Sequence, residues 1–206
     1  MKVILVNGSP HEKGCTFTAL SEVAKTLNEE GVSTQIFQLG AAPVPGCTDC
    51  GACFTLGRCV IDDKVNEFLA LAKEADGFVF GSPVYYASAN GSLTSFMDRV
   101  FFAGGSTFRL KPAAAAVSAR RAGTTASFDQ LNKYFAISEM PIVSSQYWNM
   151  VHGMEPEDVK KDLEGLQIMR TLGRNMAWLL KCKEAAAKAG VPLPKREEGT
   201  YTNFIR

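Results

Sequence analysis

Hydrophobic and polar positions along the chain follow two repeating patterns in turn. Short aliphatic runs, such as residues 2–6 and 77–81, are typical of strands buried in a parallel sheet. Between such runs apolar residues recur at helical spacing, as in residues 16–30, where Gly31 closes the helix. The expected strands are residues 2–6, 33–39, 77–81, 112–118 and 142–145. The expected helices are residues 16–30, a segment that begins at Asp62-Asp63, and residues 90–102, 124–137 and 156–189.

This alternation of strands and helices predicts an α/β fold, a three-layer sandwich with a parallel sheet between two layers of helices. Five strands fit the order 2-1-3-4-5, in which ligands bind outside the carboxyl ends of the first and third strands. The first, third and fourth strands are expected to end near residues 7, 81 and 118. Those three ends should therefore form the site.

Length and composition agree with a single domain over residues 1–206, which includes a Cys-rich loop insertion at 40–60 and a polar tail at 190–206. Hydrophobic residues make up 46%, charged residues 21%, and the formal net charge is +1. This balance indicates neither a nucleic acid nor an anionic membrane as a partner. No apolar run reaches the roughly 20 residues that cross a bilayer. The apolar start of the chain is too short for a signal peptide, so we expect a cytoplasmic protein.

Residues 7–16 join the first strand to the first helix through a loop rich in Gly and hydroxyl side chains. Such a loop presents backbone N–H groups to an anion, and the helix N-terminus adds about half a positive elementary charge. Ser9 and Thr16 are candidate hydroxyl donors, and a protonated His11 would add a charged contact. Because the sequence has neither a G-x-G-x-x-G nor a Walker motif, the loop favours a mononucleotide phosphate over NAD or ATP. On this loop alone, a plain strand-to-helix turn with an N-cap is an equal alternative.

Two further loops follow expected strands and have the surfaces that a flat ring needs. Residues 83–86 offer apolar and aromatic contact, although a subunit interface is an equal alternative for Tyr86. Small residues within 118–124 let the backbone approach a ring closely. Arg120 or Arg121 would stabilise negative charge on such a ring, and a solvated basic turn is the alternative for one of them.

Six short stretches run in a recognisable order through nearly the whole chain: residues 8–10, 81–85, 91–99, 146–149, 164–167 and 172–177. In this order they resemble the NADPH-dependent FMN reductase group of the flavodoxin superfamily. The resemblance implies a flavodoxin-like fold, bound FMN and NAD(P)H as a transient co-substrate. His11 departs from the family pattern, since many members have Arg there, and so does Cys15, where Asn or Ser is usual.

Together, the loops and the resemblance indicate a set of FMN-binding residues. They are Ser9, His11, Cys15, Thr16, Ser82, Pro83, Val84, Tyr85, Tyr86, Ser118, Arg120, Arg121 and Gly123. The resemblance implies that the flavin itself carries the chemistry, so no side chain is nominated as a catalytic acid or base.

Four of the six cysteines form the pattern Cys47-x2-Cys50-x2-Cys53-x5-Cys59. Three thiolates on a tight loop and a fourth nearby suit a [4Fe–4S] cluster, which takes one thiolate per iron. The segment resembles the compact motif of the iron–sulfur flavoproteins, a branch of the same superfamily that holds FMN and a [4Fe–4S] cluster and is linked to ferredoxin. A zinc site and a metal-free loop of thiols are the alternatives. Zinc ranks lower, because its sites usually pair two Cys-x2-Cys knuckles farther apart.

The expected function is therefore that of an FMN-dependent oxidoreductase. It would pass electrons from NAD(P)H or ferredoxin through FMN to a small acceptor such as a quinone, a flavin or an oxygen species. One alternative is a flavodoxin-like electron carrier without a substrate of its own, which the near-neutral charge disfavours mildly. The other is a structural or regulatory protein that has lost its flavin. The resemblance also implies a homodimer or homotetramer.

Overall fold

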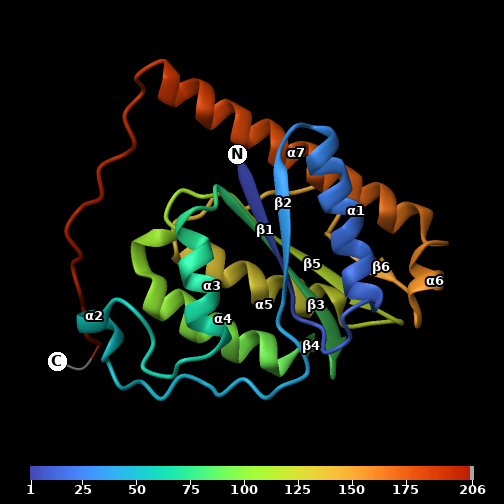
Figure 1. The fold of residues 1–206 in the computed structure, drawn as a ribbon, viewed down its shortest axis with the longest axis horizontal. Helices are drawn as coiled ribbons and strands as arrows, with labels where there is room; N and C mark the ends of the chain where they lie inside the picture. Colours follow the sequence, from blue (N-terminus) through green and yellow to red (C-terminus); the bar gives the residue numbers. More distant parts are fainter. Residues whose placement is uncertain (205–206) are drawn as a thin grey trace.

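A computed structural model of the chain describes residues 1–204, and its centre is a mostly parallel sheet (Figure 1). The strands are β1 (Lys2–Asn7), β2 (Ser33–Gln38), β3 (Gly77–Tyr85), β4 (Ser88–Ala89), β5 (Ala113–Ala119) and β6 (Met150–His152). The parallel strands follow the order β2-β1-β3-β5-β6, and the short β4 pairs antiparallel with β3. Counted without β4, this is the predicted order 2-1-3-4-5, so the predicted fold class is confirmed.

The central strands form where they do because their side chains are buried on both faces of the sheet. Every residue of β5 is buried, as are all residues of β1 after Lys2. In the register between β3 and β5, Phe78 lies opposite Ala113 and Phe80 opposite Ala115. A large ring on one strand thus pairs with a methyl group on the next, so that bulky and small side chains alternate across this layer.

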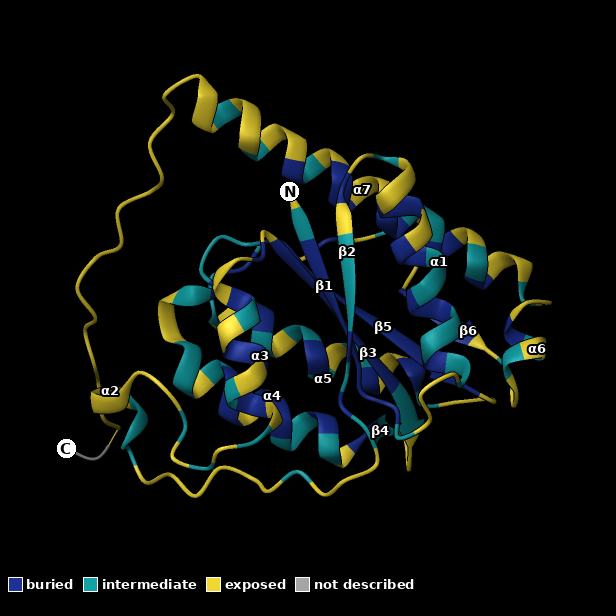
Figure 2. Cartoon of the chain, in the orientation of Figure 1, coloured by how far each residue is buried: buried dark blue, intermediate teal, exposed yellow. Residues whose placement is uncertain are grey.

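Two layers of helices cover the sheet. One face carries α3 (Lys64–Lys73), α4 (Gly91–Gly104) and α5 (Thr124–Ile137), which share a phenylalanine-rich core with β3. The other face carries α1 (Cys15–Glu29), α6 (Pro156–Val159) and α7 (Leu163–Lys188), whose core is aliphatic. Figure 2 shows the central strands β1, β3 and β5 as largely buried, the edge strand β2 as mostly intermediate, and the tail after α7 as exposed. Within residues 1–204, no helix is long and apolar enough to span a membrane.

Two predictions about the C-terminal half were wrong. The last parallel strand is β6, at Met150–His152, whereas Ile142 in the expected strand makes only a single bridge to Ala113. The helix expected over 156–189 is divided into α6 and α7, because Asp162 accepts a hydrogen bond from the Gly165 amide at 2.9 Å and starts a new helix.

Smaller differences lie in the loops. The insertion at 40–60 contains a short helix, α2 (Cys53–Leu56), and a 3-10 turn, η1 (Gly105–Thr107), follows α4. The helix expected to begin at Asp62-Asp63 begins at Lys64, and Asp63 is its N-cap. These corrections shift element boundaries and leave the sheet order unchanged.

Candidate functional site

A cavity of about 500 Å³ lies at the carboxyl ends of β1, β3, β5 and β6, within the size range of cofactor sites. The ends of parallel strands meet at one edge of a sheet, so this edge collects loops that are far apart in sequence. Most of the residues predicted to bind FMN line the cavity. They are Ser9, His11, Cys15, Thr16, Pro83, Val84, Tyr85, Ser118 and Arg120.

The loop after β1 is held in shape by side chains that the sequence analysis did not single out. Asn7 donates to the backbone oxygens of His11 and Glu12 at 3.4 and 3.3 Å, and its own oxygen accepts from the Ser9 amide. Gln38, at the end of β2, accepts from the Asn7 amide at 2.6 Å and donates to the Ser9 oxygen at 2.9 Å. Asn7 is fully buried, so the loop is already rigid before any ligand binds.

The N-terminus of α1 opens onto the cavity. Its N-cap is Gly14, and within residues 1–204 no side chain caps this helix end. The first amides of α1 are therefore available to an anion, with the positive end of the helix dipole behind them. Thr16 lies in this first turn, and its hydroxyl is 2.8 Å from that of Ser118 at the end of β5.

Cys15, the first residue of this turn, is suited to lie beside an anion. Its pKa is raised, chiefly because burial disfavours the thiolate, and the nearby carboxylates of Asp158 and Glu155 raise it further. The thiol therefore stays neutral at pH 7 and does not repel a phosphate.

The loop after β3 contributes only part of its predicted surface. Pro83, Val84 and Tyr85 line the cavity, but Tyr86 is fully exposed and has a φ of 51° in the turn that leads to β4. Ser82 is buried beneath the loop, where its hydroxyl donates to the Pro83 oxygen and accepts from the Asn90 amide. Tyr86 and Ser82 thus lie away from the cavity, one outside it and one under its wall.

In the loop after β5, too, only some of the residues predicted to bind FMN line the cavity. Arg120 lines the cavity, whereas Arg121 is exposed outside it. Gly123 has a φ of 98°, and a Cβ on it would lie 2.7 Å from the Cα of Ala87. Its role is to let the loops after β3 and β5 pack against each other, which no side chain at this position would allow.

One wall of the cavity was absent from the sequence prediction. It consists of Gly153, Met154, Glu155 and Pro156, which follow β6, and the floor adds Lys13, Gly14 and Ala119. The missed wall follows from the misplaced last strand, because residues after a parallel strand at this edge reach the site. The signal was the apolar pair Met150-Val151 followed two residues later by Gly153.

The four cysteines of the insertion meet around a second, smaller hollow. Cys47, Cys50, Cys53 and Cys59 all line it, together with Arg99 from α4. Within residues 1–204, no three metal-binding side chains are close enough to share a single ion. A four-iron cluster instead gives each iron its own thiolate, so it takes sulfurs that face one hollow but stand farther apart. The donor set of this hollow fits such a cluster.

Residues 1–155 match the family model described as NADPH-dependent FMN reductase. The chain belongs to this family. The resemblance drawn from the sequence is therefore confirmed, and the chain's general class is that of the FMN-dependent reductases.

Relatives within this family carry more specific names. An iron–sulfur flavoprotein of Methanocaldococcus jannaschii is 34% identical over 189 residues, which cover 88% of this chain and 98% of the relative. An iron–sulfur flavoprotein of Methanosarcina thermophila is 27% identical over 185 residues, 88% of this chain and 96% of its own.

Solved structures share the fold of this reductase-family chain at lower identity. NAD(P)H:quinone oxidoreductase from Methanothermobacter marburgensis has a TM-score of 0.66 at 17% identity, covering 85% of this chain and 96% of its own. RosB with a bound flavin-phosphate intermediate has a TM-score of 0.69 at 12% identity, and the match covers 100% of this chain and 92% of RosB. At these identities the likeness concerns the fold alone.

Proposed function

We propose that this chain is an FMN-dependent oxidoreductase that passes electrons through FMN to a small acceptor. NAD(P)H would give its electrons to FMN directly, and ferredoxin would give them to FMN by way of a [4Fe–4S] cluster. The observation that carries the proposal is the cavity at the strand ends, with the uncapped start of α1 on one side and Tyr85 on another. A mononucleotide needs both an anion site and a flat apolar contact, and this cavity has both.

In this proposal the FMN phosphate binds at the start of α1, where Ser9, Thr16 and the first helical amides face the cavity. The ring lies against Pro83, Val84 and Tyr85, with Arg120 near its polar edge. FMN, when bound, supplies a ring that accepts hydride or single electrons. The side chains then only bind and orient it, and the rigid Asn7–Gln38 contact keeps the phosphate loop in place.

The cysteine hollow is proposed to hold the cluster through Cys47, Cys50, Cys53 and Cys59. When bound, such a cluster supplies one-electron exchange. Two of its cysteines, Cys47 and Cys50, are exposed, so a protein donor such as ferredoxin could approach them directly. The names of the relatives support this part of the proposal.

Donor and acceptor are proposed by class. NAD(P)H would bind over the exposed flavin face, leave, and be replaced by a quinone, a flavin or an oxygen species, which predicts ping-pong kinetics. A homodimer or homotetramer in the cytoplasm remains the expected state, and light scattering would measure its size.

The decisive experiment is anaerobic purification followed by a visible spectrum and by analysis of FMN, iron and sulfide. We expect one FMN and a four-iron cluster per chain, and turnover with NADPH, NADH or reduced ferredoxin and a quinone acceptor. Cys47→Ser should lower the iron content, while Cys182→Ser, an exposed cysteine outside the insertion, should leave it unchanged.

Each part of the proposal can fail separately. Flavin without iron would remove the cluster. FMN and iron without turnover on any donor would favour the electron carrier. A colourless protein that takes up no added FMN would contradict the whole proposal.

A further inference from the structure

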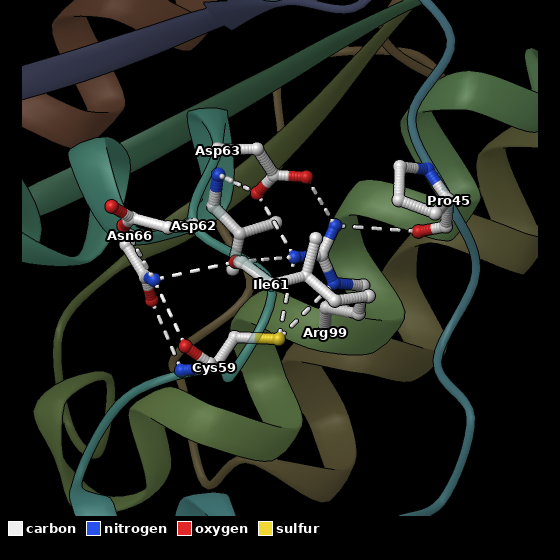
Figure 3. Close-up of polar contacts among 8 residues, drawn as sticks. Pro45, Cys59, Ile61, Asp62, Asp63, Asn66 and Arg99 are labelled. Atoms are coloured by element: carbon white, nitrogen blue, oxygen red, sulfur yellow. Dashed lines mark hydrogen bonds and ion pairs between the residues drawn. The ribbon is translucent and has the colours of Figure 1, made fainter.

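Arg99 is a fully buried arginine on α4 that the proposed chemistry does not use. Its side chain is 1% exposed, and both of its terminal nitrogens bond the carboxylate of Asp63, at 2.6 and 2.9 Å (Figure 3). Burying such an ion pair is costly, and well-packed apolar residues often stabilise a protein at least as well. Stability alone therefore gives a weak reason for an arginine here.

The remaining hydrogen bonds of Arg99 go to the cysteine insertion and to Ile61, the residue directly after it. Arg99 donates to the backbone oxygen of Pro45 at 3.3 Å, just before the first cysteine, and to that of Ile61 at 3.0 Å, just after the last. One side chain thus holds both ends of the segment that carries Cys47, Cys50, Cys53 and Cys59.

Arg99 also reaches a cysteine sulfur itself. Its Nε and Nη2 both lie 3.3 Å from Sγ of Cys59 and donate to it (Figure 3). The backbone of Cys59 is fixed as well, because its N–H donates to Asn66 at 3.0 Å and its oxygen accepts from Asn66 at 2.9 Å. Cys59 is therefore held at three atoms, whereas Cys47 and Cys50 are exposed at the open side of the hollow.

A guanidinium in this position would act on a cluster in a definite direction. Hydrogen bonds to cysteine sulfur and nearby charge are two of the terms that set the reduction potential of an iron–sulfur cluster. Reduction adds one electron, and hence one negative charge, to a site with a fixed positive charge beside it. The positive charge stabilises the reduced form more than the oxidised form, so the potential rises.

We propose that Arg99 is a positioning residue of the cysteine site, which fixes Cys59 and raises the reduction potential of the cluster, with Asp63 tempering its charge. This inference rests on the proposed function, since it needs a cluster to act on. It adds a determinant that lies outside the four cysteines and binds no iron.

The test compares Arg99→Gln, Arg99→Lys and Asp63→Asn with the wild type, each purified anaerobically. Midpoint potentials are measured by dithionite titration, in which dithionite supplies the electron, with the reduced cluster followed by electron paramagnetic resonance. We expect R99Q to shift the potential to more negative values and to lose at least twofold in iron per FMN. R99K keeps the positive charge but loses the planar set of N–H donors that holds Cys59, Pro45 and Ile61. Its reduction potential should therefore stay nearer that of the wild type, while iron is still lost.

Asp63→Asn separates charge from structure. Asn caps a helix about as well as Asp, so the start of α3 is preserved. With the carboxylate charge gone, the positive charge of Arg99 is less balanced, and the potential should shift to more positive values. A merely structural role would move R99Q and D63N in the same direction or leave the potential unmoved, and either result would overturn the inference.

The matched control is Arg170→Gln, which removes another arginine that pairs with a carboxylate, Glu22 at 2.6 Å, on the opposite face of the sheet. It should change neither iron content nor potential. If R99Q does not fold, R99K and D63N still give the test. A wild type that holds no iron after anaerobic purification and reconstitution overturns the proposed cluster and this inference together. A wild type with iron but unshifted variants overturns the inference alone.

Discussion

Tyr134 and Asp98 form a polar contact between α5 and α4. The tyrosine hydroxyl donates to the carboxylate at 2.5 Å, and the ring lies against Phe101. Burial raises the pKa of Tyr134 well above its usual range, and the hydrogen bond to Asp98 and its charge raise it further. The folded protein therefore keeps a proton that the unfolded chain gives up at alkaline pH.

This contact predicts a specific loss of stability in alkali. Above about pH 10 the unfolded state binds fewer protons than the folded state, so the free energy of unfolding falls as pH rises. Tyr134→Phe removes this proton, so its stability curve should be flatter above that pH. At pH 7 it should be less stable by about 1–3 kcal/mol, because a hydrogen bond to a charged group is lost. Urea denaturation across pH 7–11 measures both effects.

Asp98→Asn is the companion variant for this test. It keeps a hydrogen-bond acceptor but removes the charge, so its alkaline slope should lie between those of the wild type and Y134F. A Y134F curve parallel to that of the wild type above pH 10 would show that the tyrosine proton is not linked to folding.

At the residue scale, sequence reasoning identified which loops reach the site better than which side chains do. Pro83, Val84 and Tyr85 line the cavity, but the positive φ of Tyr86 turns it to solvent. That turn depends on the pairing of β4 with β3. A strand of two residues is too short to show a hydrophobic pattern, so the sequence did not predict this pairing. The Asn7–Gln38 contact was missed for a similar reason: the predicted strand order makes the two strands neighbours, but it does not give the register that places Asn7 opposite Gln38.

Gly173 shows how two elements of the same layer are matched. It lies in α7, where a Cβ would come within 2.9 Å of Cβ of Thr26 in α1 and 3.2 Å of the Val23 oxygen. The close approach of α1 and α7 on this face therefore needs a residue without a side chain.

Gly173→Ala should consequently destabilise the protein despite the better helix propensity of alanine. The propensity gain is about 1 kcal/mol, and overpacking of a tight contact costs about 1–3 kcal/mol, so we expect a net loss. Gly91→Ala is the matched control, because Gly91 opens α4 and a Cβ there meets nothing within 4 Å. Urea denaturation should show G91A close to the wild type. A G173A protein as stable as the wild type would mean that α1 and α7 can separate at little cost.

The position of the last strand was the main error at the scale of elements, and it affected the site as well. Residues 142–145 and 150–152 each contain only two apolar residues in sequence, so periodicity could not choose between them. Hydrogen-bonded pairing with β5 decides which segment is the strand, since Met150 and Val151 lie beside Val117 and Ser118 of β5. Strand order, by contrast, follows from the chain-long alternation of elements and the right-handed connections it imposes.

At the scale of the whole molecule, the two candidate sites are separate. Of the residues that the structure describes, none lines both the strand-end cavity and the cysteine hollow. Figure 1 shows α2 of the insertion on the side opposite to α6, which borders the cavity. The cavity could be anticipated from strand topology, whereas the path of the insertion is set by contacts such as Arg99 to Pro45, which have no repeating signal.

The cavity also joins the ends of four strands and the start of α1, so its ligand should stabilise the whole fold. A ligand that binds only the folded state adds RT ln(1 + [L]/Kd), or about 2.7 kcal/mol at a hundredfold excess over Kd. We expect added FMN to raise the melting temperature of the flavin-free protein. Riboflavin, which lacks the phosphate, should bind at least tenfold more weakly, which corresponds to about 1.4 kcal/mol less stabilisation at equal concentration.

Ser9→Ala should reduce the stabilisation by FMN and leave the stabilisation by riboflavin unchanged. Ser9 lies in the phosphate loop, whereas the ring contacts lie in the loops after β3 and β5. Equal stabilisation by FMN and riboflavin would mean that the start of α1 does not bind the phosphate.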